Sequence, residues 1–321
     1  MPLPSERAPQ GGLGHLIVGG IAFVLVAPLG LVAIPLAALL LVSHPRSTPE
    51  IVVAGTCAGF GLWWLMVPGE LPDQVLRAGV ISASALYVMA TRWTQISFTH
   101  RALGAIAVTG AGITGLLAVL GSSWGELQWW VEFRAGQSAR QLLGAVSAAG
   151  ERSRILAPTA AQIETFEQGL STMTRLVADF FPAISALQLL AGLLLATVAY
   201  ARLVRQPVGR PAEPFQFFGF TEHLGWIAVG ALVVVVTPKL SAAELPAANV
   251  LLIVAVLYAL RGAAVLAFGL ALSGRGGFFL WAAFGVILFL MLPVVVGGVI
   301  LLGVLDAGLN LRRRWLSAAN G

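Results

Sequence analysis

Long apolar runs separated by short polar segments make up most of the chain. Six clear runs occupy about 50–67, 72–91, 102–120, 181–204, 224–237 and 247–272. An α-helix needs about 20 apolar residues to cross a bilayer, and it satisfies its own backbone hydrogen bonds there. The pattern therefore predicts an all-α fold, a polytopic bundle of transmembrane helices.

The first and last apolar runs, Leu13–Val42 and Gly277–Gly308, are longer than one crossing requires. Helix-disrupting residues interrupt them at Pro28, Gly30, Pro35, Pro293 and Gly297–Gly298. Because proline removes a backbone donor, the first run is expected to form two short helices, at about 13–27 and 30–43. We expect about 8–10 helical segments in all, some of them short or broken. Whether each terminal run crosses the membrane once or twice stays open at this stage.

Residues 122–179 have a different character, because acidic residues and arginines enter and the apolar positions become periodic. An apolar stripe with spacings of three and four runs along Ile163, Phe166, Leu170, Met173, Val177 and Phe180. This spacing is typical of one face of an amphipathic helix. Upstream, Trp124, Trp129, Trp130 and Phe133 form an aromatic cluster typical of a membrane interface.

The chain is thus expected to have three parts. These are N-terminal transmembrane helices (1–121), an amphipathic helical insertion (122–179) and C-terminal transmembrane helices (180–321). The insertion is expected either to lie on the outer membrane surface or cap the bundle, or to serve as a lid or partner-binding surface. Its candidate partner-binding residues are Trp129, Trp130, Phe166, Leu170 and Met173.

Composition supports the membrane class. Of the 321 residues, 58% are hydrophobic and only 10% are charged, whereas about 25% are charged in an ordinary soluble domain. This excludes a soluble domain, a disordered chain or a nucleic-acid-binding domain as the main identity. The net charge is +5, and arginines are grouped near 92–101, 202–210 and 312–314. Since such clusters favour the cytoplasmic side, both termini are expected in the cytoplasm and the insertion outside it.

Arg261 is the most informative position, because it lies roughly 16–21 Å from either end of its apolar helix. A central arginine costs about 2.5–3.5 kcal/mol to insert, so its side chain should face the bundle interior and have a partner. Asp306, the only carboxylate in the predicted membrane core, is the expected partner. Asn310 shares its helix face, and Gly262 would let another backbone approach. Two interpretations stay open for Arg261: an anion or substrate contact, and a snorkelling or structurally paired arginine. For Asp306 a structural clamp between the last helices is favoured over proton coupling.

The candidate substrate-binding residues are therefore Arg261, Asp306, Asn310, Tyr258 and Asn249. Asn249 lies early in its helix, where an amide side chain is expected to cap a helix or to bond between helices. No two histidines have metal-ligand spacing, and Cys57 is the single cysteine, so no metal site and no cofactor is expected. Gly121–Gly125 fits G-x-S-x-G but ends a helix without a nearby histidine, so no enzyme is expected.

The C-terminal third resembles a known family. The carrying features are Asn249 opening a helix, the segments Leu257–Gly262 and Leu302–Asp306, and the ending Leu311–Arg314, with Phe181–Ala183 opening an earlier span. They resemble the YybS-like family of uncharacterised bacterial polytopic membrane proteins over roughly 180–314. Arg261 departs from the pattern, where a neutral polar residue is expected. The family is distantly similar to the substrate-binding subunits of energy-coupling-factor transporters and to the cell-shape membrane protein MreD.

The resemblance implies a multi-pass protein of a bacterial inner membrane, and it implies no established activity. Two functions stay open. The first is transport, as a substrate-binding membrane subunit or small-solute carrier that relies on a partner ATPase, another membrane subunit or an ion gradient. The second is a non-enzymatic scaffold or assembly factor for envelope machinery that binds partners through the insertion. The lipid bilayer is the expected surroundings in both, and nucleic acid is expected in neither.

Overall fold

The computed structural model describes residues 27–43, 47–152, 160–210, 212–221, 223–272, 292–309 and 311–312. Every regular element in this part of the chain is helical. The α-helices are α2 (Gly30–Val42), α3 (Thr48–Met66), α4 (Leu71–Trp93), α5 (Phe98–Val119), α6 (Trp124–Arg152), α7 (Ala160–Asp179), α8 (Phe181–Leu203), α9 (His223–Val236), α10 (Glu244–Leu272) and α12 (Leu292–Leu309). Two short 3₁₀ helices are η2 (Phe215–Phe217) and η3 (Pro238–Ala243). The predicted all-α bundle is confirmed.

The helices differ in length as the apolar runs predicted. Within the described residues, α3, α4, α5, α8 and α10 are long and apolar enough to cross a membrane. By contrast, α2 has 13 residues and α9 has 14, so the expectation of short segments is confirmed. The expected break in the first run is consistent with α2 starting at Gly30. The expected helix at 13–27, and the first half of the last run, lie outside the described residues.

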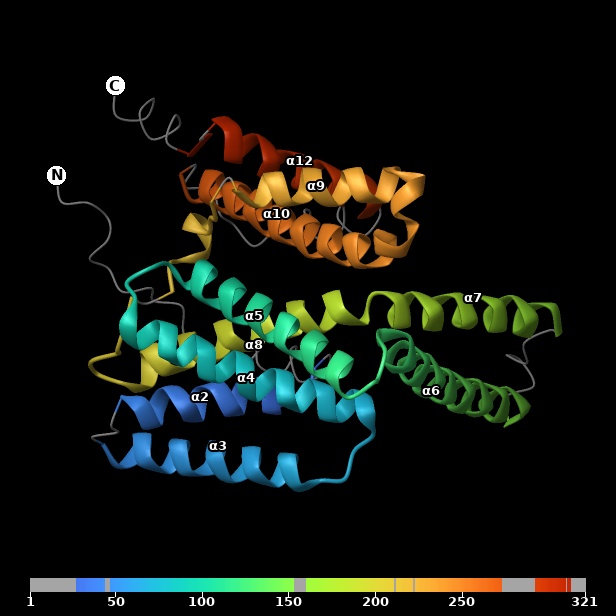
Figure 1. Ribbon diagram of the computed structural model, residues 1–321, viewed down its shortest axis with the longest axis horizontal. Coiled ribbons are helices and arrows are strands. Elements are labelled where there is room, and N and C mark those ends of the chain that lie inside the picture. The colour runs from blue at the N-terminus through green and yellow to red at the C-terminus, as the bar shows by residue number, and fades with distance from the viewer. Residues whose placement is uncertain are drawn as a thin grey trace.

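The bundle has two groups of helices that meet along α8 (Figure 1). α2, α3, α4 and α5 lie on one side, and α9, α10 and α12 lie on the other. One apolar core joins the groups, because Leu40, Tyr87, Leu193 and Leu257 belong to the same cluster of buried side chains. These four residues come from α2, α4, α8 and α10, so the first and last parts of the chain fold around a common interior.

α6 and α7 form a helical hairpin that projects beyond the bundle (Figure 1). Only Phe180 separates α7 from α8, and the axis of α7 continues that of α8. With α8 in the membrane, the 20 residues of α7 extend out of it rather than along its surface. The near-continuous α7–α8 junction favours a hairpin that projects from the bundle, and the expectation that these helices lie on the outer membrane surface or cap the bundle stays a prediction.

Polar contacts at the base of the hairpin hold this direction. Gln128 Nε2 donates to the carboxylate of Asp179, which ties α6 to the end of α7. Arg134 Nη1 donates to Asp73 Oδ1 at 2.7 Å, which ties α6 to the start of α4. The hydrogen bond that it donates to Asp73 raises the pKa of the Arg134 guanidinium above its ordinary value.

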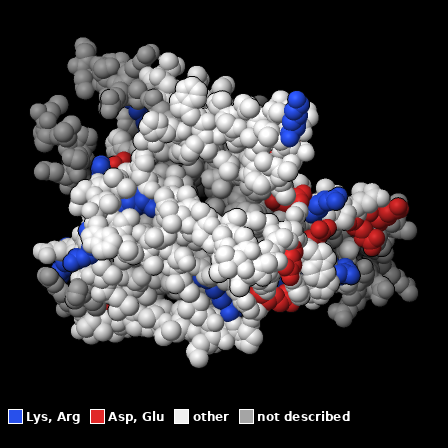
Figure 2. Space-filling view, viewed as in Figure 1, with Lys and Arg blue, Asp and Glu red and all other residues white. Residues whose placement is uncertain are grey.

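Charged side chains mark two opposite ends of the bundle. On the face seen in Figure 2, they gather toward the two ends and on the hairpin, and the band between them is nearly free of charge. The arginine-rich end is defined by Arg92, Arg101, Arg202, Arg205, Arg210 and Arg312, in or next to the helix termini and loop at that end. The hairpin end is the opposite one, from which α6 and α7 project.

Candidate functional site

Arg261 on α10 pairs with Asp306 on α12 inside the bundle, as the sequence predicted. The two residues are 6% and 1% exposed. Arg261 Nε donates to Asp306 Oδ2 at 2.9 Å, and Nη2 donates to the backbone oxygen of Asp306 at 3.2 Å. Nη1 donates to the backbone oxygen of Phe220 at 3.2 Å. All three guanidinium nitrogens of Arg261 are therefore occupied by protein acceptors.

Arg312 joins this pair, so the site is a three-residue ion cluster of Arg261, Asp306 and Arg312. Arg312 Nη2 donates to Asp306 Oδ2 at 2.8 Å, and Nη1 donates to the backbone oxygen of Gln216 at 3.0 Å. Two guanidinium groups thus share one carboxylate oxygen. The other oxygen, Asp306 Oδ1, is buried and has no hydrogen-bond partner among the described residues. Two cations and one anion leave the ion cluster with a net charge of +1.

Two glycines allow α10 and α12 to cross at backbone contact. A Cβ atom added at Gly262 would lie 1.9 Å from the Val299 backbone oxygen, and one added at Gly303 would lie 2.0 Å from that of Tyr258. Neither position has room for any side chain. The expected close approach at Gly262 is confirmed, and it brings the Arg261 and Asp306 backbones near enough for the side chain to bond in two places.

An aromatic pair separates the ion cluster from the adjoining surface. The Arg261 guanidinium lies over the Phe220 ring at 5.3 Å, a cation–π arrangement. Phe220 in turn meets Tyr258 edge-to-face, with ring centroids 5.0 Å apart. Phe220 therefore contacts both the Arg261 guanidinium and the Tyr258 ring.

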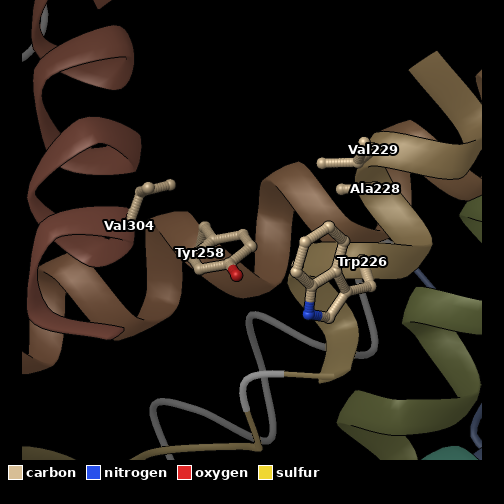
Figure 3. Close-up of a pocket in the computed structure, with 6 residues that line it drawn as sticks. Trp226, Ala228, Val229, Tyr258 and Val304 are labelled. Atoms are coloured by element: carbon tan, nitrogen blue, oxygen red, sulfur yellow. The ribbon is translucent and has the colours of Figure 1, made fainter. Parts of the chain in front are cut away.

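The Tyr258 hydroxyl enters a groove of about 390 Å³ between α9, α10 and α12 (Figure 3). The groove is lined by Gly225, Trp226, Ala228, Val229, Tyr258 and Val304. The Tyr258 hydroxyl is directed toward α9, where a Cβ atom on Gly225 would lie 3.1 Å from it. Trp226 is 75% exposed, so the groove opens to the outside of the bundle. The arrangement is an apolar slot with one hydroxyl and one indole as polar groups.

The structure brings together three of the five predicted substrate-binding residues. Arg261, Asp306 and Tyr258 lie in or beside the ion cluster. Asn249 lies nine positions before Tyr258 on α10, about 13 Å along the helix axis. Its Oδ1 accepts from the Ala183 backbone N–H at 3.0 Å, and its Nδ2 donates to the Asp179 backbone oxygen at 2.9 Å. The expected bond between helices at Asn249 is confirmed. Asn310 lies outside the described residues.

The predicted partner-binding residues lie on the hairpin. Trp129 stacks on Phe133 at 5.4 Å and meets Trp130 edge-to-face at 5.1 Å, so the aromatic cluster is formed within α6. On α7, Phe166 and Met173 are 48% and 64% exposed. Leu170 between them is half-buried. The apolar stripe thus leaves part of its area uncovered on a helix that projects from the bundle.

Sequence reasoning missed several residues at these sites. Phe220 precedes α9 in a loop, and no periodicity marks a loop carbonyl as an arginine acceptor. Trp226 resembles any aromatic residue near a helix end, so nothing in the sequence indicated that it lines a groove. Arg312 was expected only as a cytoplasmic charge, although its spacing of six from Asp306 allows contact from the end of the same helix.

Comparison with known proteins places the chain in a family. A family model described as "Predicted membrane protein (DUF2232)" matches residues 16–307. No curated protein and no solved structure matches the chain. The expectation of an uncharacterised family of membrane proteins is confirmed.

Proposed function

This chain belongs to the DUF2232 family of predicted membrane proteins, and we propose that it is a transport-related membrane protein. Its role is that of a substrate-binding membrane subunit, or a small-solute carrier, without an ATPase of its own. The groove between α9, α10 and α12 is the substrate site. The proposed role is non-enzymatic.

The groove beside the ion cluster is the observation that carries this proposal. Its volume of about 390 Å³ falls in the usual range for small-molecule sites, roughly 300–1,000 Å³. Such sites are mostly apolar with a few placed polar groups, and here the Tyr258 hydroxyl and the Trp226 indole have that character. The net positive charge behind Phe220 favours a solute with an apolar body and a polar or anionic end.

A source of energy for transport follows from what the sequence contains. It has no Walker-type phosphate loop with its lysine, so a partner ATPase or an ion gradient would drive transport. The distant resemblance to substrate-binding subunits of energy-coupling-factor transporters supports the first of these. In that arrangement another membrane subunit would connect this protein to the ATPase.

We place the protein in the inner membrane of a bacterium, with the arginine-rich end and both termini in the cytoplasm. Six arginines define that end, and the described carboxylates near it are those of Glu50, Glu213 and Asp306. Arginine-rich loops are retained on the cytoplasmic side during insertion. The hairpin of α6 and α7 then projects on the extracytoplasmic side.

A groove-filling substitution tests the proposal. In Val304→Trp the indole occupies the groove, and in the matched control Leu305→Trp it lies about 100° around α12 on a position that is also exposed. Each protein is purified gently, and its small-molecule content is measured by mass spectrometry. We expect a solute that co-purifies with the wild type and Leu305→Trp and is depleted at least about tenfold in Val304→Trp. Equal content in all three proteins contradicts the substrate site.

A second function, a partner-binding scaffold for envelope machinery, is favoured by the exposed stripe on α7. Phe166 and Met173 present apolar area on a projecting helix, where no bundle neighbour covers them among the described residues. A paired substitution, Phe166→Glu with Met173→Glu, should abolish recovery of a partner from native membranes and leave the thermal midpoint unchanged. Ser171→Glu, an exposed position with a side chain bonded to the Gln168 carbonyl, is the control. An unchanged set of partners in the paired variant contradicts the scaffold.

A further inference from the structure

Arg101 is a buried cation that forms no ion pair with a carboxylate in the described part of the chain. It lies in the first turn of α5 at the arginine-rich end, and it is 2% exposed. Nη2 donates to the Arg210 backbone oxygen at 2.7 Å. Nε and Nη1, which together carry three N–H donors, are buried and have no hydrogen-bond partner among the described residues.

The surroundings of Arg101 are formed by three segments. The guanidinium lies over the Tyr87 ring of α4 at 5.7 Å. On another side lies the loop after α8, where Gly209 has a φ of +81°. A Cβ atom on Gly209 would lie 2.7 Å from Thr91 Cγ2 and 3.0 Å from Arg101 Nη1. The glycine backbone therefore lies directly against the guanidinium, where a side chain has no room.

The buried charge of Arg101 is less well compensated than that of Arg261. A guanidinium does not deprotonate in proteins, so burial cannot neutralise it. An unpaired buried ion is strongly destabilising, and a cation–π contact offsets only part of that cost. Arg261 has Asp306 as counterion, whereas no described carboxylate forms an ion pair with Arg101. An anion bound at Arg101 would compensate its buried positive charge.

We propose that Arg101 is the core of a binding site for a phosphate group. The planar fork of arginine matches phosphate oxygens, and the unpartnered Nε and Nη1 donors are the groups that such an anion needs. Exposed Arg92, Arg202 and Arg205 at the same end add positive potential, which favours a multiply charged anion over a single carboxylate. The phosphate comes either from an anionic lipid headgroup or from a free phosphate in the cytoplasm.

The loop after α8 controls access to Arg101. The Tyr200 hydroxyl accepts from the Val208 N–H at 2.9 Å, and Arg210 supplies the carbonyl that Arg101 now bonds. An entering phosphate accepts from the unpartnered Nε and Nη1 once the loop shifts, while the Arg210 carbonyl stays on Nη2 and Tyr200 keeps the loop attached to α8. The site is separate from the groove and does not rest on the proposed transport function.

Ligand-dependent thermal stability tests this site. The full-length protein is placed in nanodiscs of zwitterionic phosphatidylcholine, and inorganic phosphate is compared with chloride at equal ionic strength. A parallel sample contains phosphatidylglycerol without added phosphate. We expect the thermal midpoint of the wild type to rise by about 2–5 °C in one of these samples. A rise with inorganic phosphate identifies a free phosphate, and a rise only with phosphatidylglycerol identifies a lipid headgroup.

Arginine variants separate this site from general charge effects. Arg101→Gln should lose the rise, and its midpoint without phosphate should equal or exceed that of the wild type, because an unpaired buried charge is removed. Arg92→Gln, an exposed arginine at the same end, should keep the rise. If Arg101→Gln does not fold, Arg101→Lys keeps the charge without the fork, and a reduced rise is expected. A rise in no sample, or an equal rise in the wild type and the Arg101 variants, overturns the proposal.

Discussion

At the scale of single residues, Arg261 acts first on the position of its own helix. Its guanidinium bonds twice to Asp306 and once to the Phe220 carbonyl, so α10, α12 and the loop before α9 meet at one side chain. α10 and α12 line the groove around Tyr258 together with α9, the helix that follows this loop. Arg261 therefore shapes the proposed substrate site, and its charge reaches a solute across the Phe220 ring.

Replacing the carboxylate of the ion cluster by an amide of the same shape should strongly lower the free energy of unfolding. Asp306→Asn keeps the side-chain shape but leaves the buried guanidinium of Arg261 and the partly buried one of Arg312 without a counterion. Breaking such a pair should lower the free energy of unfolding by about 3–5 kcal/mol. Glu213→Gln removes an exposed carboxylate that pairs with Arg210, where a loss below about 1 kcal/mol is expected. Reversible unfolding in detergent measures both, and similar losses would show that the ion cluster does not hold the helices.

The pairing of Arg261 with Asp306 could be predicted because the sequence shows how far a charged residue lies from the ends of its apolar run. A charge in the middle of a span needs a partner, and one carboxylate was available. Phe220 and Arg101 could not be found in this way. Every residue has a backbone carbonyl, so the sequence does not single out that of Phe220. Arg101 was expected only as a cytoplasmic charge, because its burial depends on where α5 begins and on the loop at Gly209.

At the scale of helices, the crossing of α10 and α12 sets the geometry of the site. The backbones touch at Gly262, which directly follows Arg261, and at Gly303, which lies about one turn before Asp306. Apolar runs gave the helix positions to within a few residues. They could not give the direction of the hairpin, because an amphipathic stripe does not say whether it lies on lipid or projects. Nor could they show the groove, which exists only where three helices meet.

The glycine contacts allow a matched test on one helix pair. Gly262→Ala or Gly303→Ala places a methyl group onto backbone atoms, so a destabilisation of about 1–3 kcal/mol or more is expected from overpacking. Gly298→Ala on α12 meets nothing within 4 Å, and helix propensity predicts a neutral effect or a gain of up to about 1 kcal/mol. Thermal midpoints in detergent compare the three variants. The opposite order would contradict the crossing.

At the scale of the whole molecule, the opposite ends differ in charge and shape. One end is rich in arginine, and the other continues into the hairpin. This asymmetry predicts the orientation in the membrane, because arginine-rich loops stay cytoplasmic. In a Cys57→Ser background, a cysteine at Ser171 on the hairpin should react with an impermeant maleimide added to intact cells. A cysteine at Gln206 should react only after the membrane is opened; the reverse pattern would invert the topology.

We propose that the groove between α9, α10 and α12 holds a solute in the living membrane. The most direct measurement replaces Trp226 with a photo-crosslinking amino acid and determines the mass of what becomes attached in native membranes. Ile227, an exposed position about 100° around α9 that does not line the groove, serves as the lipid-facing control. We expect an adduct of one defined non-lipid mass at position 226, and we expect it to be lost when Val304→Trp is added. At position 227 we expect only lipid adducts. Identical lipid adducts at both positions would contradict a substrate site.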